Sequence, residues 1–178
     1  MNQYSDFSKE LVSRYMSTDE ETNELYKKRY VPLGSEKLLE LATAKPEKAD
    51  GEPELKKFYE TFFKDSGLIF DAIIGPSGAV FLRESGAAIK IVDAKDATAG
   101  AINQAPIYPN DKYNLLINAY ARKTVIIQVP EGTEKSMNIL FAAINEPLIL
   151  KVIIEVGRDS SLNLMEWYAS SEAKTLLS

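Results

Sequence analysis

Few residues in this sequence have the type and spacing that chemistry needs. Ser171 and Lys174 form a Ser-x-x-Lys, in which a lysine one helical turn away can take the proton of a nucleophilic serine. The other motifs that accompany such a pair are missing, and a chain with many serines and lysines produces this spacing by chance. We therefore rank a small hydrolase that uses Ser171 and Lys174 third, below the two functions given at the end of this subsection.

A second candidate is the pair Glu155 and Glu166, read as two carboxylates for general acid–base catalysis. No cluster of sugar-binding aromatic residues accompanies them, so solvated or turn-capping roles are favoured. The chain has no cysteine and no histidine, which excludes disulfides, thiolate nucleophiles, imidazole bases and Cys/His metal sites. We predict that the chain is not an enzyme and has no catalytic, cofactor-binding or metal-binding residues of its own.

The charge and hydropathy of the chain argue against two classes of partner. Its 178 residues carry a formal net charge of -5, whereas nucleic-acid binding requires clustered Lys and Arg that neutralise phosphates. No apolar run approaches the roughly 20 residues needed to span a bilayer, and Asp6 and Glu10 interrupt the start of the chain where a signal peptide would be apolar. We expect a cytoplasmic protein without nucleic-acid binding or membrane insertion.

Helical periodicity dominates the first part of the chain. One helix is predicted by apolar residues at steps of four, namely Phe7, Leu11 and Tyr15. A second helix is predicted by a capping-box pattern, in which Ser17 and Thr18 precede Glu20. A more regular helix begins at Pro53 and ends before Gly67, and another is expected over 111–121. We divide the chain into a helical N-terminal region, 1–66, and a β-rich region, 67–178.

Short aliphatic and β-branched runs fill the β-rich region. The first three, over 68–74, 79–82 and 87–92, predict a strand meander with tight turns, and Gly75 to Gly78 is one such turn because it lacks the lysine of a phosphate-binding loop. Four more runs, over 125–129, 137–143, 148–156 and 162–168, return about every 13 residues. This interval fits an antiparallel meander in a sandwich or successive rungs of a β-helix, and periodicity alone does not choose between them.

Four segments of this region form a specific set when their order and spacing are taken together. The segments run from Asp111 to Tyr120, from Val125 to Gly132, from Val152 to Gly157 and from Ser161 to Glu166. This set resembles the SufB/SufD family of iron–sulfur cluster assembly proteins. They are similar to that family's helix with a Leu-Asn-Ala-like step, its strand ending in a Val-Pro-x-Gly turn, and its next strand pair. Arg122-Lys123-Thr124 replaces the usual Asp-Gly-type turn, and the family's aromatic-basic segment is missing near 34–51, so a divergent SufD-like member is favoured.

The resemblance covers about a third of the chain, from Asp111 to Ser170, and implies both a fold and a role. The implied fold is α+β: a helical N-terminal region, a β-meander, and the first rungs of a right-handed parallel β-helix. The implied role is that of a non-catalytic scaffold, with a SufB- or SufD-like partner subunit, a SufC-type ATPase that binds the family's C-terminal region, and an iron–sulfur cluster in the assembled complex. The family's Cys, His and Glu for cluster building lie in the later β-helix, beyond the matching part.

Two further expectations remain open. An unpaired strand at the end of the β-rich region would invite self-association through its edge. The alternative function, of a different class, is a stand-alone β-rich domain that binds a ligand or a protein.

Overall fold

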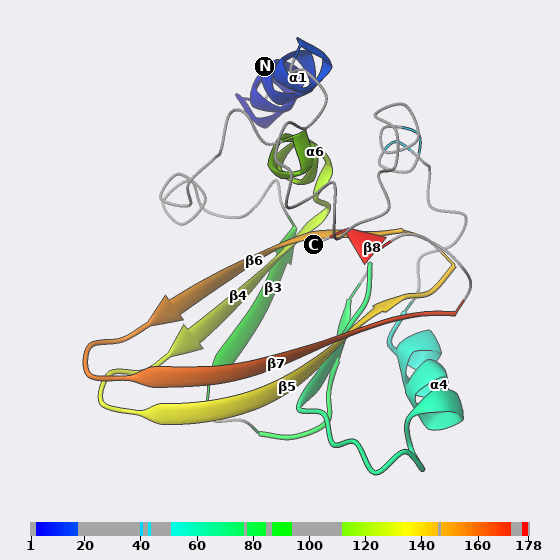
Figure 1. The fold of residues 1–178 in the computed structure, drawn as a ribbon, viewed down its shortest axis with the longest axis vertical. Coiled ribbons are helices and arrows are strands. Elements are labelled where there is room, and N and C mark those ends of the chain that lie inside the picture. Colours follow the sequence, from blue (N-terminus) through cyan, green and yellow to red (C-terminus); the bar gives the residue numbers. More distant parts are fainter. Residues whose placement is uncertain are drawn as a thin grey trace, which may run out of the picture.

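The computed structural model of the chain describes residues 3–17, 40, 43, 51–76, 78–84, 87–93, 112–145, 147–171 and 176–177. Within these residues it is a mixed α+β structure with two mixed sheets, and neither sheet closes into a barrel (Figure 1). The helices are α1 (Gln3–Ser17), α4 (Glu52–Phe62) and α6 (Lys112–Tyr120). The strands are β1 (Ala72–Ile74), β2 (Ala79–Phe81), β3 (Ala88–Asp93), β4 (Lys123–Val129), β5 (Glu134–Ala143), β6 (Leu148–Val156), β7 (Ser161–Ser170) and β8 (Leu176–Leu177).

Three of the expected helices are confirmed within a few residues of their predicted bounds. Helix α4 begins with Pro53 in its first turn, and the Glu54 carboxylate accepts a hydrogen bond of 3.0 Å from the Gly51 N–H, as one half of a capping box. Beyond its last turn, Gly67 adopts φ +74°, a conformation that glycine reaches without a steric penalty. The helix expected after Ser17 lies outside the described residues.

All three runs predicted for the first strand group are strands, but the third does not lie beside the second as expected. Strands β1 and β2 form an antiparallel hairpin, closed by a Gly75 N–H that donates to the Gly78 carbonyl at 2.9 Å. Strand β3 does not continue this meander, because it lies in the other sheet and pairs antiparallel with β4. Ile89 and Ile91 of β3 alternate toward the core, and a strand in either sheet would show the same alternation. The period of the sequence therefore could not show to which sheet β3 belongs.

The last five strands alternate between two sheets. Sheet A has the order β2-β1-β5-β7 and sheet B the order β3-β4-β6-β8. Each of β4, β5 and β6 pairs in parallel with the strand two places further along the chain. The offset is 27 residues for both long pairs, since Lys123 is opposite Leu150 and Glu134 is opposite Ser161. These pairings exclude an antiparallel meander for β4 to β8.

A shared core fills the space between the two sheets. It contains Val125 and Ile127 of β4, Ile139 and Phe141 of β5, and Leu150 of β6, all fully or almost fully buried. The sheets come together at the turns that follow β4 and β6 and separate toward the opposite side (Figure 1). Every second residue of each strand therefore faces this core, and the residues between face outward.

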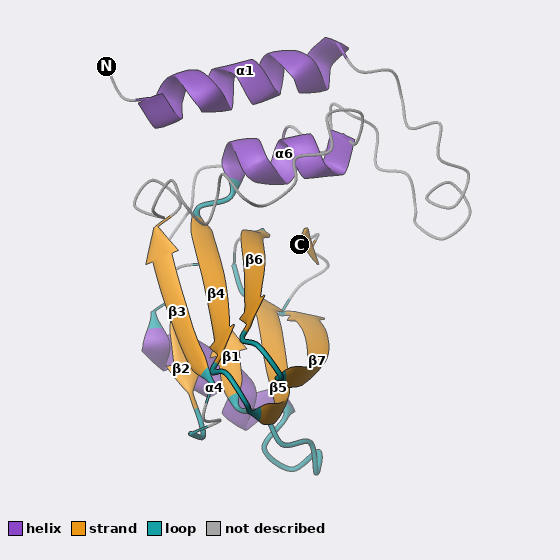
Figure 2. Ribbon diagram, turned by 90° about the vertical axis from the view of Figure 1, so that its left-hand side faces the viewer, coloured by secondary structure: helices purple, strands orange, loops and turns teal. Residues whose placement is uncertain are grey.

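The helices pack at two separate places outside the shared core. Leu55 and Phe58 of α4 pack with Leu140 and Ala142 on the outer side of sheet A. At the other end of the molecule, Leu11 of α1 packs on α6, which lies over the ends of β3, β4 and β6 (Figure 2). Helix α1 is thus held by contacts with a helix about 100 residues away in the sequence.

Candidate functional site: the open end of the two sheets

The strands that build the site are aligned by two stacked turns. Gly132 and Asp159 occupy the same place in successive turns, 27 residues apart, and both have positive φ, +69° and +53°. The Gly132 N–H donates to the Arg158 carbonyl at 2.9 Å, and the Gly157 N–H donates to the Val129 carbonyl at 2.9 Å. These bonds between the turns continue the hydrogen-bond ladder from the strands through the turns. They therefore fix the register of β6 against β4 and of β7 against β5.

At one end of the stacked strands, the described residues include no further strand paired along the whole edge. Strand β7 is the last strand of sheet A, and β8 pairs with β6 only at Leu148 and Ile149. Among the strands of the described part of the chain, none pairs with the side of β7 that faces away from β5. None pairs with the side of β6 that faces away from β4, from Leu150 onward. We call this end, formed by β6 from Leu150 to Val156 and by all of β7, the open end.

Apolar side chains at the open end face the space between the sheets. Leu162 and Leu164 of β7 and Val152 of β6 belong to the shared core but are only partly buried. By the alternation of β6, Ile154 and Val156 face the same way, and they are 45% and 46% exposed. Aliphatic side chains at such positions are buried when another strand covers them, as β7 covers β5.

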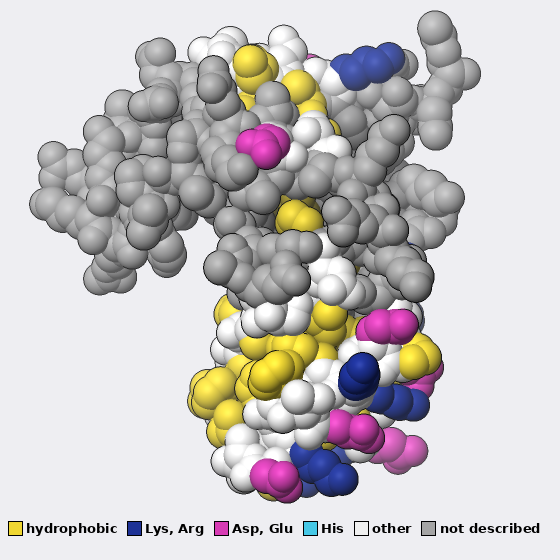
Figure 3. All heavy atoms as spheres, turned by 90° about the vertical axis from the view of Figure 1, so that its right-hand side faces the viewer, with side chains coloured by type: hydrophobic (Ala, Val, Ile, Leu, Met, Phe, Trp, Pro, Cys, Tyr) yellow, Lys and Arg dark blue, Asp and Glu magenta, His cyan; other side chains and the backbone are white. Residues whose placement is uncertain are grey.

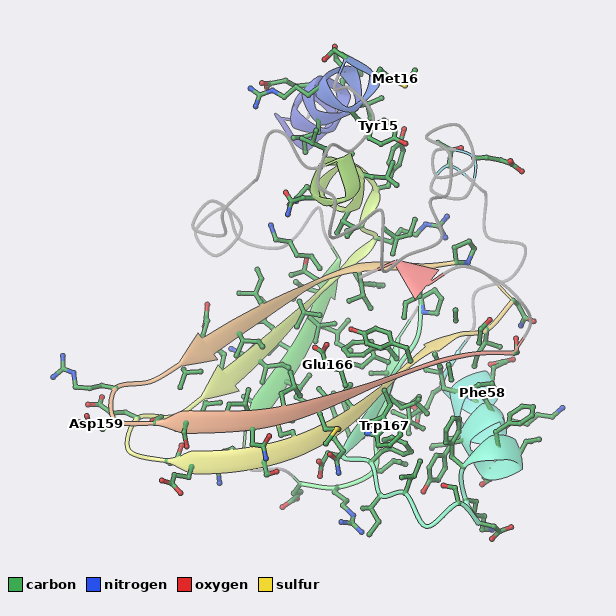
Figure 4. The ribbon with its side chains drawn as sticks, in the orientation of Figure 1. Tyr15, Met16, Phe58, Asp159, Glu166 and Trp167 are labelled. Atoms are coloured by element: carbon green, nitrogen blue, oxygen red, sulfur yellow. The ribbon has the colours of Figure 1, made fainter. Side chains whose placement is uncertain are left out.

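One carboxylate lies among these inward-facing side chains. Glu166 is two residues after Leu164 and is directly opposite Ile139, a fully buried residue of β5. It accepts a hydrogen bond of 2.9 Å from the hydroxyl of Tyr168, whose ring stacks on Phe141 at 5.2 Å between centroids. Figure 4 shows Glu166 in the space between the sheets and the neighbouring Trp167 on the α4 side of β7.

Trp167 faces outward, because adjacent residues of a strand point to opposite faces and the neighbouring Tyr168 faces inward. Its ring meets Phe70 edge to face, with centroids 6.0 Å apart, beneath α4. Tyr168 is 43% exposed and faces inward. Trp167 therefore packs the outer layer, whereas Tyr168 belongs to the open end.

The two carboxylates considered as a catalytic pair do not share a site. Glu155 lies on the outer face of sheet B, where its carboxylate accepts a hydrogen bond of 2.5 Å from Gln128 Nε2. Glu166 lies in sheet A and faces inward. Ser171 is exposed at the end of β7, with its backbone N–H donating to the Ala143 carbonyl at 3.2 Å, while Lys174 lies outside the described residues. The sequence could have indicated the inward orientation of Glu166, because it continues the alternation of Leu162 and Leu164.

A partly buried chain of polar side chains lies on the outer face of sheet B, below α6. The Nζ of Lys151 donates to Asn118 Oδ1 at 2.8 Å, and Asn118 Nδ2 donates to the Asn114 carbonyl at 2.7 Å. Lys151 is opposite Thr124, which is almost fully buried. Burial lowers the pKa of Lys151 below its ordinary value of 10.5, because removal from water disfavours the charged form.

Because the pKa of Lys151 is lowered in the folded state, we predict that the free energy of unfolding depends on pH through this group. Between the pKa in the folded state and the value of 10.5, the unfolded chain binds more protons, so the free energy of unfolding contributed by this group rises with pH. The Lys151→Met and Lys151→Arg variants lack a group that titrates in this window. We expect the stability of the wild type, measured by urea unfolding relative to either variant, to increase from neutral pH toward 10.5. A difference that stays constant over this range would contradict the prediction.

No group of three or more Asp or Glu side chains that could hold a metal ion occurs among the described residues. None of the helices within the described ranges is long and apolar enough to cross a membrane.

On the face shown in Figure 3, hydrophobic side chains gather over the part formed by the sheets and α4, beside a band of mixed charges.

The chain was compared with protein-family models, curated proteins and solved structures. None of them matches it significantly. The geometry of the open end and the pairing of its strands are therefore the observations from which a function is inferred.

Proposed function

We propose that residues 123–177 form the first rungs of a right-handed parallel β-helix. The observation that supports this proposal is the in-register parallel pairing of β4 with β6 and of β5 with β7, each at an offset of 27 residues. Two strands per turn with a constant offset is the pattern of a coil that repeats along one axis. Strand β8 then begins the next coil by pairing with the first two residues of β6.

On this basis we propose a function as a non-catalytic scaffold component of an iron–sulfur cluster assembly complex, similar to the N-terminal part of a SufD-like protein. The resemblance of Asp111 to Ser170 to the SufB/SufD family supports the family, and α6 directly before β4 fits the helix-to-strand order of that resemblance. In this proposal the chain acts in the cytoplasm and carries no cofactor itself. The cluster is built in the assembled complex by residues of the later β-helix.

The proposed partners are a SufB- or SufD-like subunit and, through the complete assembly, a SufC-type ATPase. Because the family's ATPase-binding region lies beyond the part that this chain resembles, the chain alone should bind the subunit and not the ATPase. We expect the purified chain to form a complex with a SufB- or SufD-type subunit in isothermal titration calorimetry and size-exclusion chromatography. The ATPase alone serves as the matched negative control.

Failure of the folded chain to bind either type of subunit would contradict the assembly function. A folded state should be verified in the same sample by circular dichroism, so that loss of binding is not confused with unfolding. Binding to the ATPase alone would also contradict the account, since the binding region would then lie in the N-terminal part.

The alternative is a stand-alone β-rich binding domain. The open end favours it, because partly exposed aliphatic residues around one carboxylate can recognise a ligand or a protein without any relation to cluster assembly. The two functions differ in their partner: only the scaffold function requires binding to a SufB- or SufD-type subunit.

A further inference from the structure

Lys151 is a partly buried cation with a single hydrogen-bond partner in the described part of the chain. Its Nζ donates to Asn118 Oδ1 at 2.8 Å, although an ammonium group has three N–H bonds to donate. No carboxylate of a described residue forms an ion pair with it. The acidic residue of β6 is Glu155, four residues further along the strand, and its carboxylate accepts a hydrogen bond from Gln128. Among the described residues, the charge of Lys151 is therefore not compensated by an anion.

The two elements that contact Lys151 bring no negative charge to it. Strand β4 lies beside it in the ladder and α6 accepts its hydrogen bond, and neither contains an Asp or a Glu. Strand β3 lies on the far side of β4, where Lys90 is exposed and Asp93 is opposite Lys123 in the ladder. Burial disfavours the ammonium form, so the pKa of Lys151 lies below its ordinary value.

The acceptor for Lys151 is held in place by α6. Asn118 Nδ2 donates to the Asn114 carbonyl at 2.7 Å and to Asn114 Oδ1 at 3.1 Å, so the amide directs Oδ1 toward Lys151. Thr124 is opposite Lys151 in the parallel β4–β6 pair, and alternation places both residues on the outer face of sheet B. Thr124 is 1% exposed, and its hydroxyl has no hydrogen-bond partner among the described residues. Lys151 thus has a fixed acceptor and a neighbouring hydroxyl that is still able to donate.

We propose that Lys151 is an acylation site, whose amine accepts the acyl group of a small acyl phosphate. The lone pair of the neutral amine attacks the acyl carbon, and the bond from this carbon to the phosphate oxygen breaks. Phosphate leaves with the electron pair of that bond and takes up the proton that the nitrogen loses. A lysine that is removed from water is more often in the neutral, nucleophilic form than an exposed lysine. This inference does not rest on the iron–sulfur assembly function.

The acylated side chain suits the same two partners. Its amide N–H donates to Asn118 Oδ1 in place of the ammonium group, and its carbonyl oxygen accepts from the Thr124 hydroxyl, which is otherwise buried without a partner. Acylation also removes the uncompensated charge. During the attack, the same hydroxyl can donate to the oxyanion that develops on the acyl group.

The experiment measures the acetylation of every lysine of the full-length protein by acetyl phosphate at pH 7, followed over time by peptide mass spectrometry. Lys57 and Lys90 are exposed and serve as controls within the same molecule, with Lys90 in the same sheet as Lys151. We expect Lys151 to react about threefold faster than either control, because the gain in neutral amine exceeds the loss of nucleophilicity that accompanies lower basicity.

Two variants of nearly unchanged shape separate this chemistry from simple accessibility. Asn118→Asp places a carboxylate beside the Nζ of Lys151, keeps the proton on the amine, and should lower its acetylation rate about tenfold while Lys90 is unaffected. Thr124→Val removes the hydroxyl donor and should lower the rate about threefold. Urea unfolding of each variant shows that the fold is retained.

The proposal is overturned if Lys151 in the wild type reacts no faster than Lys57 and Lys90. An unchanged rate at Lys151 in folded Asn118→Asp or Thr124→Val protein would also contradict it, because reactivity would then not depend on the groups around the amine. None of these measurements involves a SufB- or SufD-type subunit, so failure here is distinguishable from failure of the assembly function.

Discussion

Replacement of Phe141 by Ala is expected to lower the free energy of unfolding by about 4 kcal/mol. Phe141 has no exposed surface, lies in the core between the two sheets, and stacks on Tyr168 across the parallel β5–β7 pair. Removing its ring leaves a cavity that the surrounding strands, paired on both sides of β5, cannot close. The change should appear as a lower urea midpoint at an unchanged slope.

Phe81 provides the matched control for this cavity. It has the same side chain and also lies in sheet A, but it is 56% exposed in the edge strand β2. The Phe81→Ala variant should change the free energy of unfolding by about 0.5 kcal/mol or less. Comparable losses in the two variants would mean that Phe141 does not lie in a closed core.

Replacement of Gly157 by Val is expected to cost about 3 kcal/mol of stability. A Cβ atom at Gly157 would lie 2.6 Å from the backbone N of Glu131 and 2.8 Å from its Cα, so the obstacle is backbone of the preceding turn and not a movable side chain. Relief requires the two turns to separate, which would break the bond from the Gly157 N–H to the Val129 carbonyl. Thermal and urea unfolding measure the loss.

Gly132 is the control for this second prediction. It has positive φ, but a Cβ atom there meets nothing within 4 Å, and Asp159 occupies the equivalent place in the next turn. Asn adopts this left-handed conformation more readily than most residues. The Gly132→Asn variant should therefore lose about 1 kcal/mol or less. A larger loss than that of Gly157→Val would contradict the stacked arrangement of the turns.

The local elements of this fold follow from the sequence. The apolar spacing of α4, with Leu55 and Phe58 on its buried face, and the aliphatic runs of β4 to β7 predict their type because burial of one face or one stripe is a local pattern. The bounds differ by a few residues, since hydrogen-bond pairing extends β7 to Ser170 and shortens β1 to Ala72–Ile74.

The pairing of the strands could not be obtained from the same patterns. Alternation shows which side of a strand is buried but not which strand lies beside it, so β3 was expected in a meander with β2 and instead pairs with β4. A longer-range signal was present. The pattern Val-Ile-Ile-x-Val occurs at 125–129 and again at 152–156, at the offset of 27 residues that the parallel β4–β6 pair has. The sequence led us to expect an unpaired strand at the end of the β-rich region, but it did not predict that Glu166 lies there, because the position of Glu166 opposite Ile139 depends on the pairing of β5 with β7.

The parallel two-sheet stack can be tested most directly by nitroxide spin labels, because the chain has no native cysteine that would need to be removed. Ser136 and Asn163 are opposite each other in the β5–β7 pair and are both exposed. Labels at Ser136→Cys and Asn163→Cys should show strong dipolar broadening in the continuous-wave spectrum, since paired strands lie about 5 Å apart. Labels at Ser136→Cys and Glu155→Cys should show weaker broadening, because they lie on different sheets and packed sheets are about 10 Å apart. An antiparallel hairpin of β5 and β6 would bring Ser136 and Glu155 together instead, so broadening in the second pair and not in the first would contradict the stack.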